Sequence, residues 1–150
     1  MPRNAPKVKI QAVEGYNAKI TLCEPTLKAR RETLEKIAKK TGAYVVHPFN
    51  EPKVIAGQGT SAMEMIEDIG NLDAICAPIG GGGLMSGTCI AARSMLPNVR
   101  LFGAEPKGAD DAYQSLKKGK LIPQDNPNTI CDGLLTLSLI HISEPTRLEP

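Results

Sequence analysis

Short apolar runs alternate along the chain with longer segments in which apolar residues recur every three or four positions. The runs predict β-strands, which we expect at residues 19–23, 43–46, 74–79 and 99–104. The longer segments are typical of amphipathic helices, which we expect at residues 7–16, 27–40 (with Thr26 as N-cap), 54–69, 84–96 and 109–118. Strands and helices that alternate with short connections favour an α/β fold with parallel strands and right-handed crossovers.

A run of four glycines joins the apolar run at residues 74–79 directly to the helical segment at residues 84–96. These glycines are Gly80, Gly81, Gly82 and Gly83. Without Cβ atoms, their backbone N–H groups can approach an anion closely, and the start of the helix adds unpaired donors and a partial positive charge. The run therefore predicts a phosphate site at the carboxyl end of a parallel strand.

Three phosphate-binding schemes compete for the glycine run. A P-loop is excluded because Thr88 stands where its lysine is required. A dinucleotide-binding GxGxxG motif lacks its third glycine, which falls on Met85 or Ser86. Glu105 nevertheless lies about 20 residues further on, where a ribose-binding acid is expected, so this scheme stays open. A single phosphate monoester needs neither lysine nor acid, and four adjacent amides suit it best.

Composition excludes several other classes of protein. The net charge is +2 and the chain has three Tyr, two Phe and no Trp, so a basic patch interleaved with stacking aromatics is missing and nucleic-acid binding is not expected. No apolar run has membrane-spanning length, and residues 1–10 lack the apolar region of a signal peptide. Cys76 and Cys89 lie in apolar surroundings, which favours buried reduced thiols. We expect a soluble, cytoplasmic protein without a membrane partner.

Acidic residues gather after the run at residues 99–104, at Glu105, Asp110 and Asp111. Asp110 and Asp111 stand at the start of the helical segment at residues 109–118. Carboxylates at such a position cap the first amides and complement the positive end of the helix. On spacing alone we interpret both as helix-capping residues.

Three motifs together resemble one enzyme family. They are HPFNEPKVIAGQGTSAMEM at residues 47–65, PIGGGGLMSG at residues 78–87 and AEPKGADDAYQSLKKGKL at residues 104–121. In this order they resemble serine racemase and the threonine/serine dehydratases, pyridoxal-phosphate enzymes of the tryptophan-synthase-β type. The likeness extends over nearly all of residues 1–136. It implies a fold-type II enzyme, of which this chain holds a partial three-layer α/β/α structure with parallel strands.

The resemblance also implies how the chain is divided. Residues 1–51 belong to the small mobile domain and residues 52–136 to the large cofactor-binding domain. Residues 137–150 look instead like a translated sequencing adapter, so we expect a non-native tail there. The family's SFKxRG-like segment, whose lysine binds the cofactor covalently, does not occur in this sequence. We therefore expect an internal fragment that is inactive alone. The resemblance also implies that the complete protein is a homodimer.

The same resemblance assigns site residues. It implies that backbone amides hold the phosphate of pyridoxal 5'-phosphate at Gly80, Gly81, Gly82, Gly83 and Leu84. It also implies a divalent cation, Mg²⁺, Mn²⁺ or Ca²⁺, held by Glu105, the Ala109 carbonyl and Asp111. Hard oxygen ligands of this kind suit those ions.

Other positions correspond to the family less closely. Arg30 matches a position near the substrate carboxylate, although an exposed helix arginine is the plainer interpretation. Tyr16 matches a position near a nucleotide effector, and His47 is either part of the active-site wall or a structural histidine. Gly57 and Gly59 weaken a helix and so indicate close packing.

The resemblance implies a function for the complete protein. It predicts an enzyme that acts on L-serine or L-threonine, by racemisation or by elimination to a 2-oxo acid and ammonia. The cation motif favours a serine racemase/dehydratase over a biosynthetic or catabolic threonine dehydratase. An NAD-dependent oxidoreductase and a non-catalytic fragment remain as alternatives from other classes.

Overall fold

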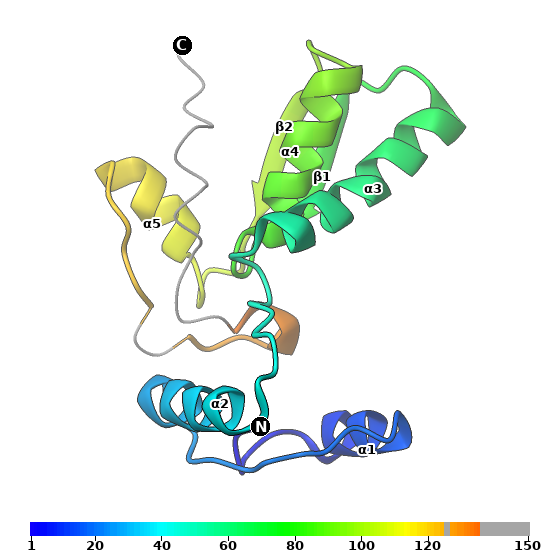
Figure 1. The fold of residues 1–150 in the computed structure, drawn as a ribbon. Coiled ribbons are helices and arrows are strands. Elements are labelled where there is room, and N and C mark those ends of the chain that lie inside the picture. Colours follow the sequence, from blue (N-terminus) through cyan, green and yellow to red (C-terminus); the bar gives the residue numbers. More distant parts are fainter. Residues whose placement is uncertain (125–126, 136–150) are drawn as a thin grey trace. The chain divides into compact units, whose positions relative to one another are not determined.

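The computed structural model describes residues 1–124 and 127–135 of the chain (Figure 1). The adapter-like segment predicted at residues 137–150 lies outside the described residues. The chain divides into two compact units, Met1–Val46 and His47–Pro150. The assignment of residues 1–51 and 52–136 to a small mobile domain and a cofactor domain stays a prediction.

The first unit contains two helices, α1 (Lys7–Gly15) and α2 (Leu27–Thr41). The predicted N-cap of α2 is confirmed, because the Oγ1 atom of Thr26 accepts a hydrogen bond of 3.1 Å from the Ala29 amide. The helix ends where Gly42 takes a left-handed conformation with φ of 70°, which favours glycine. Both helices therefore form where the periodicity predicts them.

Neither strand predicted in the first unit forms. At residues 19–23 a single parallel bridge joins Pro2 to Cys23, and residues 43–46 have no strand conformation. A strand needs a neighbour along its whole length to accept and donate its ladder of hydrogen bonds. Within the described residues, the segment at residues 19–23 has only the single bridge to Pro2. The β-branched composition of these two segments is therefore not sufficient for them to form strands.

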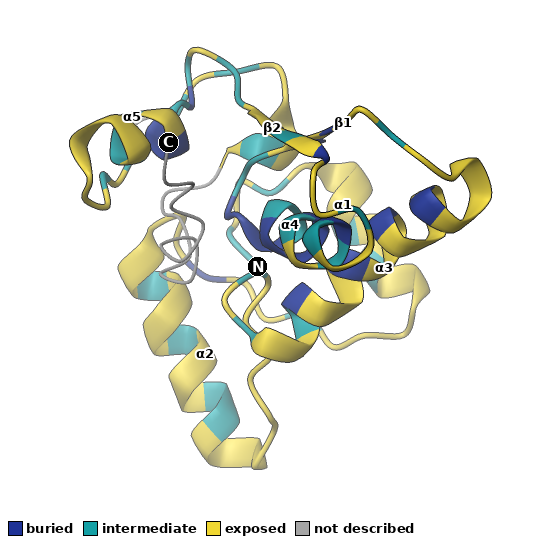
Figure 2. Cartoon of the chain, turned by 90° about the horizontal axis from the view of Figure 1, so that it is seen from above, coloured by how far each residue is buried: buried dark blue, intermediate teal, exposed yellow. Residues whose placement is uncertain are grey.

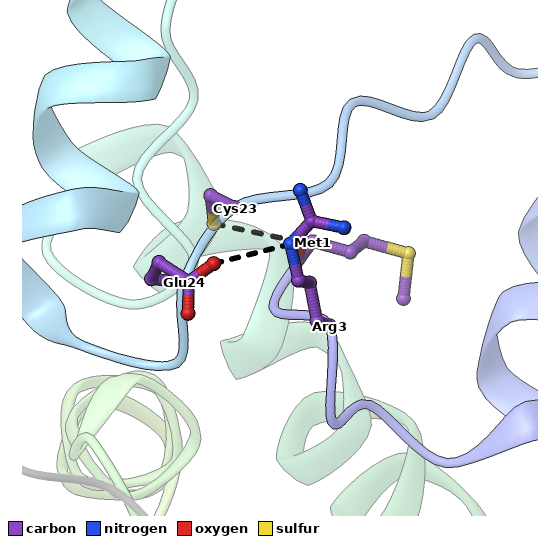
Figure 3. A network of polar contacts seen from close by, with 4 residues as sticks. All are labelled: Met1, Arg3, Cys23 and Glu24. Carbon is purple, nitrogen blue, oxygen red and sulfur yellow. Dashed lines mark hydrogen bonds and ion pairs between the residues drawn. The ribbon is translucent and has the colours of Figure 1, made fainter.

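Polar contacts fix the amino-terminal segment around that bridge (Figure 3). The Cys23 amide donates to the Met1 carbonyl at 2.8 Å, and the Arg3 amide donates to the Cys23 carbonyl at 2.9 Å. The Cys23 thiol also donates to the Met1 carbonyl, at 3.4 Å, and Arg3 Nε pairs with Glu24 Oε1 at 3.1 Å. The Arg3–Glu24 pair is exposed, so we expect it to contribute little to stability.

The second unit is built around a parallel strand pair with a helical crossover. Its elements are α3 (Pro52–Ile69), β1 (Ala74–Pro78), α4 (Gly83–Met95), β2 (Arg100–Ala104), α5 (Asp111–Lys118) and the short 3₁₀ helix η1 (Asp132–Leu134). β1 and β2 pair in parallel from Ala74↔Arg100 to Pro78↔Ala104. The strands and helices predicted for this unit are confirmed, with bounds shifted by up to two residues. Within the described residues, no helix is both long enough and apolar enough to cross a membrane.

The core of the second unit lies between the helices and one face of the strands. Its buried members are Ile66, Ile75, Ala92 and Val99, and the partly buried Leu72, Leu96 and Leu101 pack against them. Figure 2 shows buried residues along the adjacent sides of α3 and α4 and on β1. The helices and strands supply two of the three expected layers.

The other face of β1 is exposed. Burial alternates along the strand, so that Ile75 and Ala77 are buried whereas Cys76 is exposed. The prediction of a buried Cys76 is therefore wrong, because its side chain lies on the face that the described helices do not cover. Cys89 is partly buried, and burial raises the pKa of its thiol, with a smaller opposing effect from the Arg93 charge.

Two glycines bring α3 and α4 into backbone contact. A Cβ atom on Gly59 would lie 2.9 Å from the Gly87 carbonyl oxygen. A Cβ atom on Gly87 would lie 2.5 Å from the Gly59 amide nitrogen and closer still to the Ile55 carbonyl oxygen. The close packing predicted for Gly59 is confirmed, whereas a Cβ atom on Gly57 would meet nothing within 4 Å. The prediction for Gly57 is wrong.

This contact predicts opposite effects for two glycine-to-alanine changes. Gly87→Ala should lower the free energy of unfolding by about 1–3 kcal/mol, because the new methyl group forces α3 and α4 apart. The matched control, Gly57→Ala, places a methyl group in open space and should raise it by about 0.5–1 kcal/mol. Denaturant unfolding measures both. Equal effects of the two substitutions would contradict the close approach of the helices.

Candidate active site

The glycine run forms the loop between β1 and α4. Beyond the end of β1, the Ile79 amide donates to the Ala104 carbonyl at 2.9 Å, so the loop begins at the carboxyl end of both strands. Gly82 is the N-cap of α4 and has φ of 93° and ψ of −9°. This left-handed conformation disfavours any residue with a Cβ atom. The chain therefore turns from strand to helix at a position where glycine is required.

The first turn of α4 directs its amides toward the loop. The first helical hydrogen bond runs from the Ser86 amide to the Gly82 carbonyl at 2.9 Å. The amides of Gly83, Leu84 and Met85 precede it and have no carbonyl within the helix to donate to. Together with the positive end of the helix dipole they favour an anion. The amide donors fit the phosphate monoester of pyridoxal phosphate.

Phe49 packs directly against this loop. Cβ atoms on Gly81 and Gly83 would both contact Phe49, the first at its ring and the second at its Cβ, 3.0 Å away. Phe49 was not predicted as a site residue, because no sequence spacing relates position 49 to position 81. The only local signal is an aromatic residue between two prolines ahead of a helix, which alone indicates a rigid connection.

His47 is the structural partner of Phe49. Its Nδ1 atom accepts hydrogen bonds from the Asn50 amide at 2.9 Å and from the Phe49 amide at 3.4 Å. The two rings meet edge-to-face, with centroids 4.7 Å apart and planes at 86°. These contacts support the interpretation of His47 as a structural histidine that shapes the turn.

Glu105 caps α5, a role that spacing had assigned to the two aspartates. Its Oε1 atom accepts from the Ala112 amide at 3.0 Å, and its Oε2 atom accepts from the Tyr113 amide at 2.8 Å. Asp110 occupies the N-cap position without a side-chain cap bond, and its Oδ2 atom accepts instead from the Gln114 side chain at 2.9 Å. The capping interpretation of Asp110 and Asp111 is wrong. Glu105, which precedes the helix, lies across the connecting loop and accepts the hydrogen bonds of the first-turn amides of Ala112 and Tyr113 instead.

Asp111 is the most deeply buried carboxylate of this region. It is 2% exposed, and its Oδ2 atom has no hydrogen-bond partner. Burial raises the pKa of Asp111; its own backbone amide partly offsets this rise, and the neighbouring Asp110 charge adds a smaller rise. Burial likewise raises the pKa of Glu105, which its two amide partners partly offset. The region thus carries negative charge that the protein itself does not fully compensate.

An oxygen-binding cation fits this arrangement in part. The buried, unpartnered oxygen of Asp111 is the kind of atom that a hard cation binds, and Ala109 beside it is buried, with its amide donating to the Pro106 carbonyl at 2.8 Å. Among the residues that the structure describes, no three His, Cys, Asp or Glu side chains converge as a metal cluster. A cation here depends on a backbone carbonyl and water in addition to the carboxylates.

The remaining predicted residues lie in the first unit. Arg30 is exposed on α2, and Tyr16, 85% exposed, follows α1. Their roles at the substrate carboxylate and at a nucleotide effector stay predictions. Within the second unit, the structure places the glycine loop at the carboxyl ends of β1 and β2, and Glu105, Ala109 and Asp111 follow β2.

The raised pKa values predict how stability depends on pH. A carboxyl whose pKa is raised by folding binds more protons in the folded state, so its contribution to stability is full below the unfolded pKa and is lost as the pH rises through the folded pKa. With a chelator present, Asp111→Asn should therefore flatten the decline in unfolding free energy that begins above about pH 4. Denaturant titrations at several pH values measure this slope.

The matched control is Asp68→Asn, which removes the same charge from an exposed position on α3. The unfolding free energy of this variant should depend on pH more nearly as in the wild type than that of Asp111→Asn does. Parallel pH profiles for Asp111→Asn and the wild type would show that Asp111 is not the source of the effect.

Comparison with known proteins identifies the relatives of this chain. Residues 1–146 match the family described as "Pyridoxal-phosphate dependent enzyme". The chain is 51% identical over 135 residues to β-hydroxyaspartate dehydratase of Paracoccus denitrificans and 49% identical over 138 residues to serine racemase of Dictyostelium discoideum. These matches cover 90% and 91% of this chain and 43% of each relative, so the chain spans less than half the length of the curated relatives it matches.

A solved structure shows the same fold. Maize serine racemase superposes with a TM-score of 0.93 at 40% identity, over 96% of this chain and 44% of that one. The predicted family resemblance and the predicted fold class, a fold-type II α/β structure with parallel strands, are both confirmed.

Proposed function

The chain belongs to the pyridoxal-phosphate-dependent enzyme family, and we propose that the complete protein is a serine racemase/dehydratase. Its substrates would be small β-hydroxy amino acids, L-serine or L-threonine, converted by racemisation or by elimination to a 2-oxo acid and ammonia. The glycine loop supports this most directly, because its amides suit a phosphate monoester. The names of the relatives support it further, since serine racemase and β-hydroxyaspartate dehydratase both act on amino acids with a β-substituent.

In this proposal the loop binds and orients the cofactor. The amides of Gly80, Gly81, Gly82, Gly83 and Leu84 would donate to the phosphate. When bound, pyridoxal phosphate would supply the electron sink that stabilises charge as the substrate α-proton is removed. Because the loop begins at the strand ends, it would hold the phosphate in a fixed position relative to the second unit and so orient the cofactor for chemistry by residues elsewhere in the protein.

A divalent cation, Mg²⁺, Mn²⁺ or Ca²⁺, would bind at Glu105, the Ala109 carbonyl and Asp111. The unpartnered Oδ2 atom of Asp111 supports this site, as do the raised pKa values of both carboxyls. A cation would offset their mutual repulsion and hold the segment that connects β2 to α5. This role is structural and activating.

The complete protein would be a cytoplasmic homodimer. Its covalent lysine lies in a segment that this sequence does not include, so the present chain would be inactive by itself. Arg30 would contribute to substrate binding, and Tyr16 to a nucleotide effector site.

Two alternatives are weaker. A threonine dehydratase shares the fold, as threonine deaminase structures at 30% and 37% identity illustrate, and differs in substrate preference. An NAD-dependent oxidoreductase is not favoured, because the family match is to pyridoxal-phosphate enzymes.

Cofactor binding tests the proposal. The full-length protein should bind pyridoxal phosphate with a visible absorbance band and should not bind NAD, whereas residues 1–150 alone should show no such band. Gly82→Ala should weaken pyridoxal-phosphate affinity about tenfold, because a Cβ atom costs about 1–2 kcal/mol at a left-handed φ. Absorbance titration measures the affinity.

Gly70→Ala is the matched control for this substitution. Gly70 also has a positive φ, 87°, but ends α3 away from the loop. It should lower stability without weakening pyridoxal-phosphate binding. Equal loss of affinity in both variants would mean that the effect of Gly82→Ala is merely one of stability.

The cation site makes a separate prediction. Mg²⁺, Mn²⁺ or Ca²⁺ should raise the melting temperature of the full-length protein and stimulate its activity. Glu105→Ala and Asp111→Ala should each abolish both effects, because each removes an oxygen ligand. The exposed Asp68→Asn serves as the control and should retain them. Undiminished cation stimulation in Glu105→Ala would exclude this site.

A further inference from the structure

The glycines of the loop are required for two different physical reasons. Gly82 has a left-handed φ of 93°, whereas Gly81 and Gly83 do not have a positive φ. A Cβ atom on Gly81 would instead fall on the Phe49 ring, in contact with its Cγ and Cδ1 atoms and 2.5 Å from its Cε1 atom. Backbone conformation therefore requires glycine at 82, whereas the space taken by Phe49 requires it at 81.

Phe49 contacts the loop at two points. Besides the ring against Gly81, its backbone lies against the first residue of α4, where a Cβ atom on Gly83 would be 3.1 Å from Phe49 Cα and 3.3 Å from its carbonyl oxygen. Phe49 is partly buried by these contacts. Phe49 therefore lies against the two residues that flank Gly82.

Phe49 is itself held in place. His47 accepts the Asn50 and Phe49 amides and packs edge-to-face on the Phe49 ring at 4.7 Å. Pro52 then begins α3 directly after this turn, and α3 contacts α4 through Gly59 and Gly87. The turn and the loop are thus attached to the same pair of packed helices.

We propose that Phe49 is a positioning residue for the phosphate site. Its ring fills the space beside Gly81, and its Cβ and backbone atoms fill the space beside Gly83. Phe49 thereby limits the conformations of the loop and keeps the amides directed at one anion. Restricting the loop before binding lowers the entropy lost when the phosphate binds. This inference rests on the proposed function, since it assumes that the loop holds the cofactor phosphate.

A double-mutant cycle in the full-length protein tests the role of Phe49. Phe49→Ala should weaken pyridoxal-phosphate and inorganic-phosphate binding, and Gly81→Ala should weaken them more, because its methyl group displaces the loop from the ring. In the double variant the methyl group occupies the space that the ring leaves. It should therefore bind at least about threefold more tightly than Gly81→Ala alone.

Gly82→Ala is the internal control for this rescue. Its defect comes from backbone conformation, so combining it with Phe49→Ala should not restore affinity. Independent effects of Phe49→Ala and Gly81→Ala, or rescue of Gly82→Ala to the same extent, would overturn the proposal. If the wild-type protein binds no pyridoxal phosphate, the proposed function fails together with this inference; if it binds normally without coupling, only the inference fails.

A second measurement separates positioning from general stability and does not depend on the folding of Gly81→Ala. Phe49→Leu keeps apolar bulk and should shift the ³¹P resonance of bound pyridoxal phosphate and raise its dissociation rate. Ile66→Val, which loosens the core away from the loop, should lower stability without either change. An unchanged ³¹P resonance and dissociation rate in Phe49→Leu would also overturn the positioning role.

Discussion

The backbone contact between α3 and α4 is the constraint on which the second unit depends. Gly59 and Gly87 allow the two helices to approach until main-chain atoms touch, and the small core of Ile66, Ile75, Ala92 and Val99 lies beside that contact. α4 also carries the glycine loop at its N-terminus, and α3 begins directly after the turn that contains Phe49. One helix pair therefore fixes both the amides of the glycine loop and the side chain packed against them.

Sequence patterns correctly predicted the helices and strands that depend on interactions between residues close together in the sequence. β1, α4 and β2 follow from apolar runs separated by a glycine loop and an amphipathic segment, and the Thr26 cap follows from one side chain and one amide. Residues 19–23 and 43–46 have the composition of strands but do not form them. Strand formation depends on a pairing partner, and composition contains no information about whether a partner is present.

The position of the glycine loop between a strand and a helix was predicted from the sequence, whereas contacts between distant residues were missed. Four glycines between a strand and a helix indicate an anion site without any tertiary information. Phe49 could not be identified, because its contact with Gly81 depends on how the turn before α3 packs against α4. The cap of α5 was misassigned for a similar reason: Glu105 reaches over a loop to amides seven and eight residues away, and local spacing favours the nearer aspartates.

In the complete protein, the backbone amides from Gly80 to Leu84 should hold a phosphate monoester. A crystal structure of the full-length protein with pyridoxal phosphate would show whether they do. We expect phosphate oxygens within about 2.7–3.2 Å of these amide nitrogens, with Phe49 still packed on Gly81. A phosphate bound elsewhere, or held by lysine and arginine side chains with the loop amides pointing away, would contradict it.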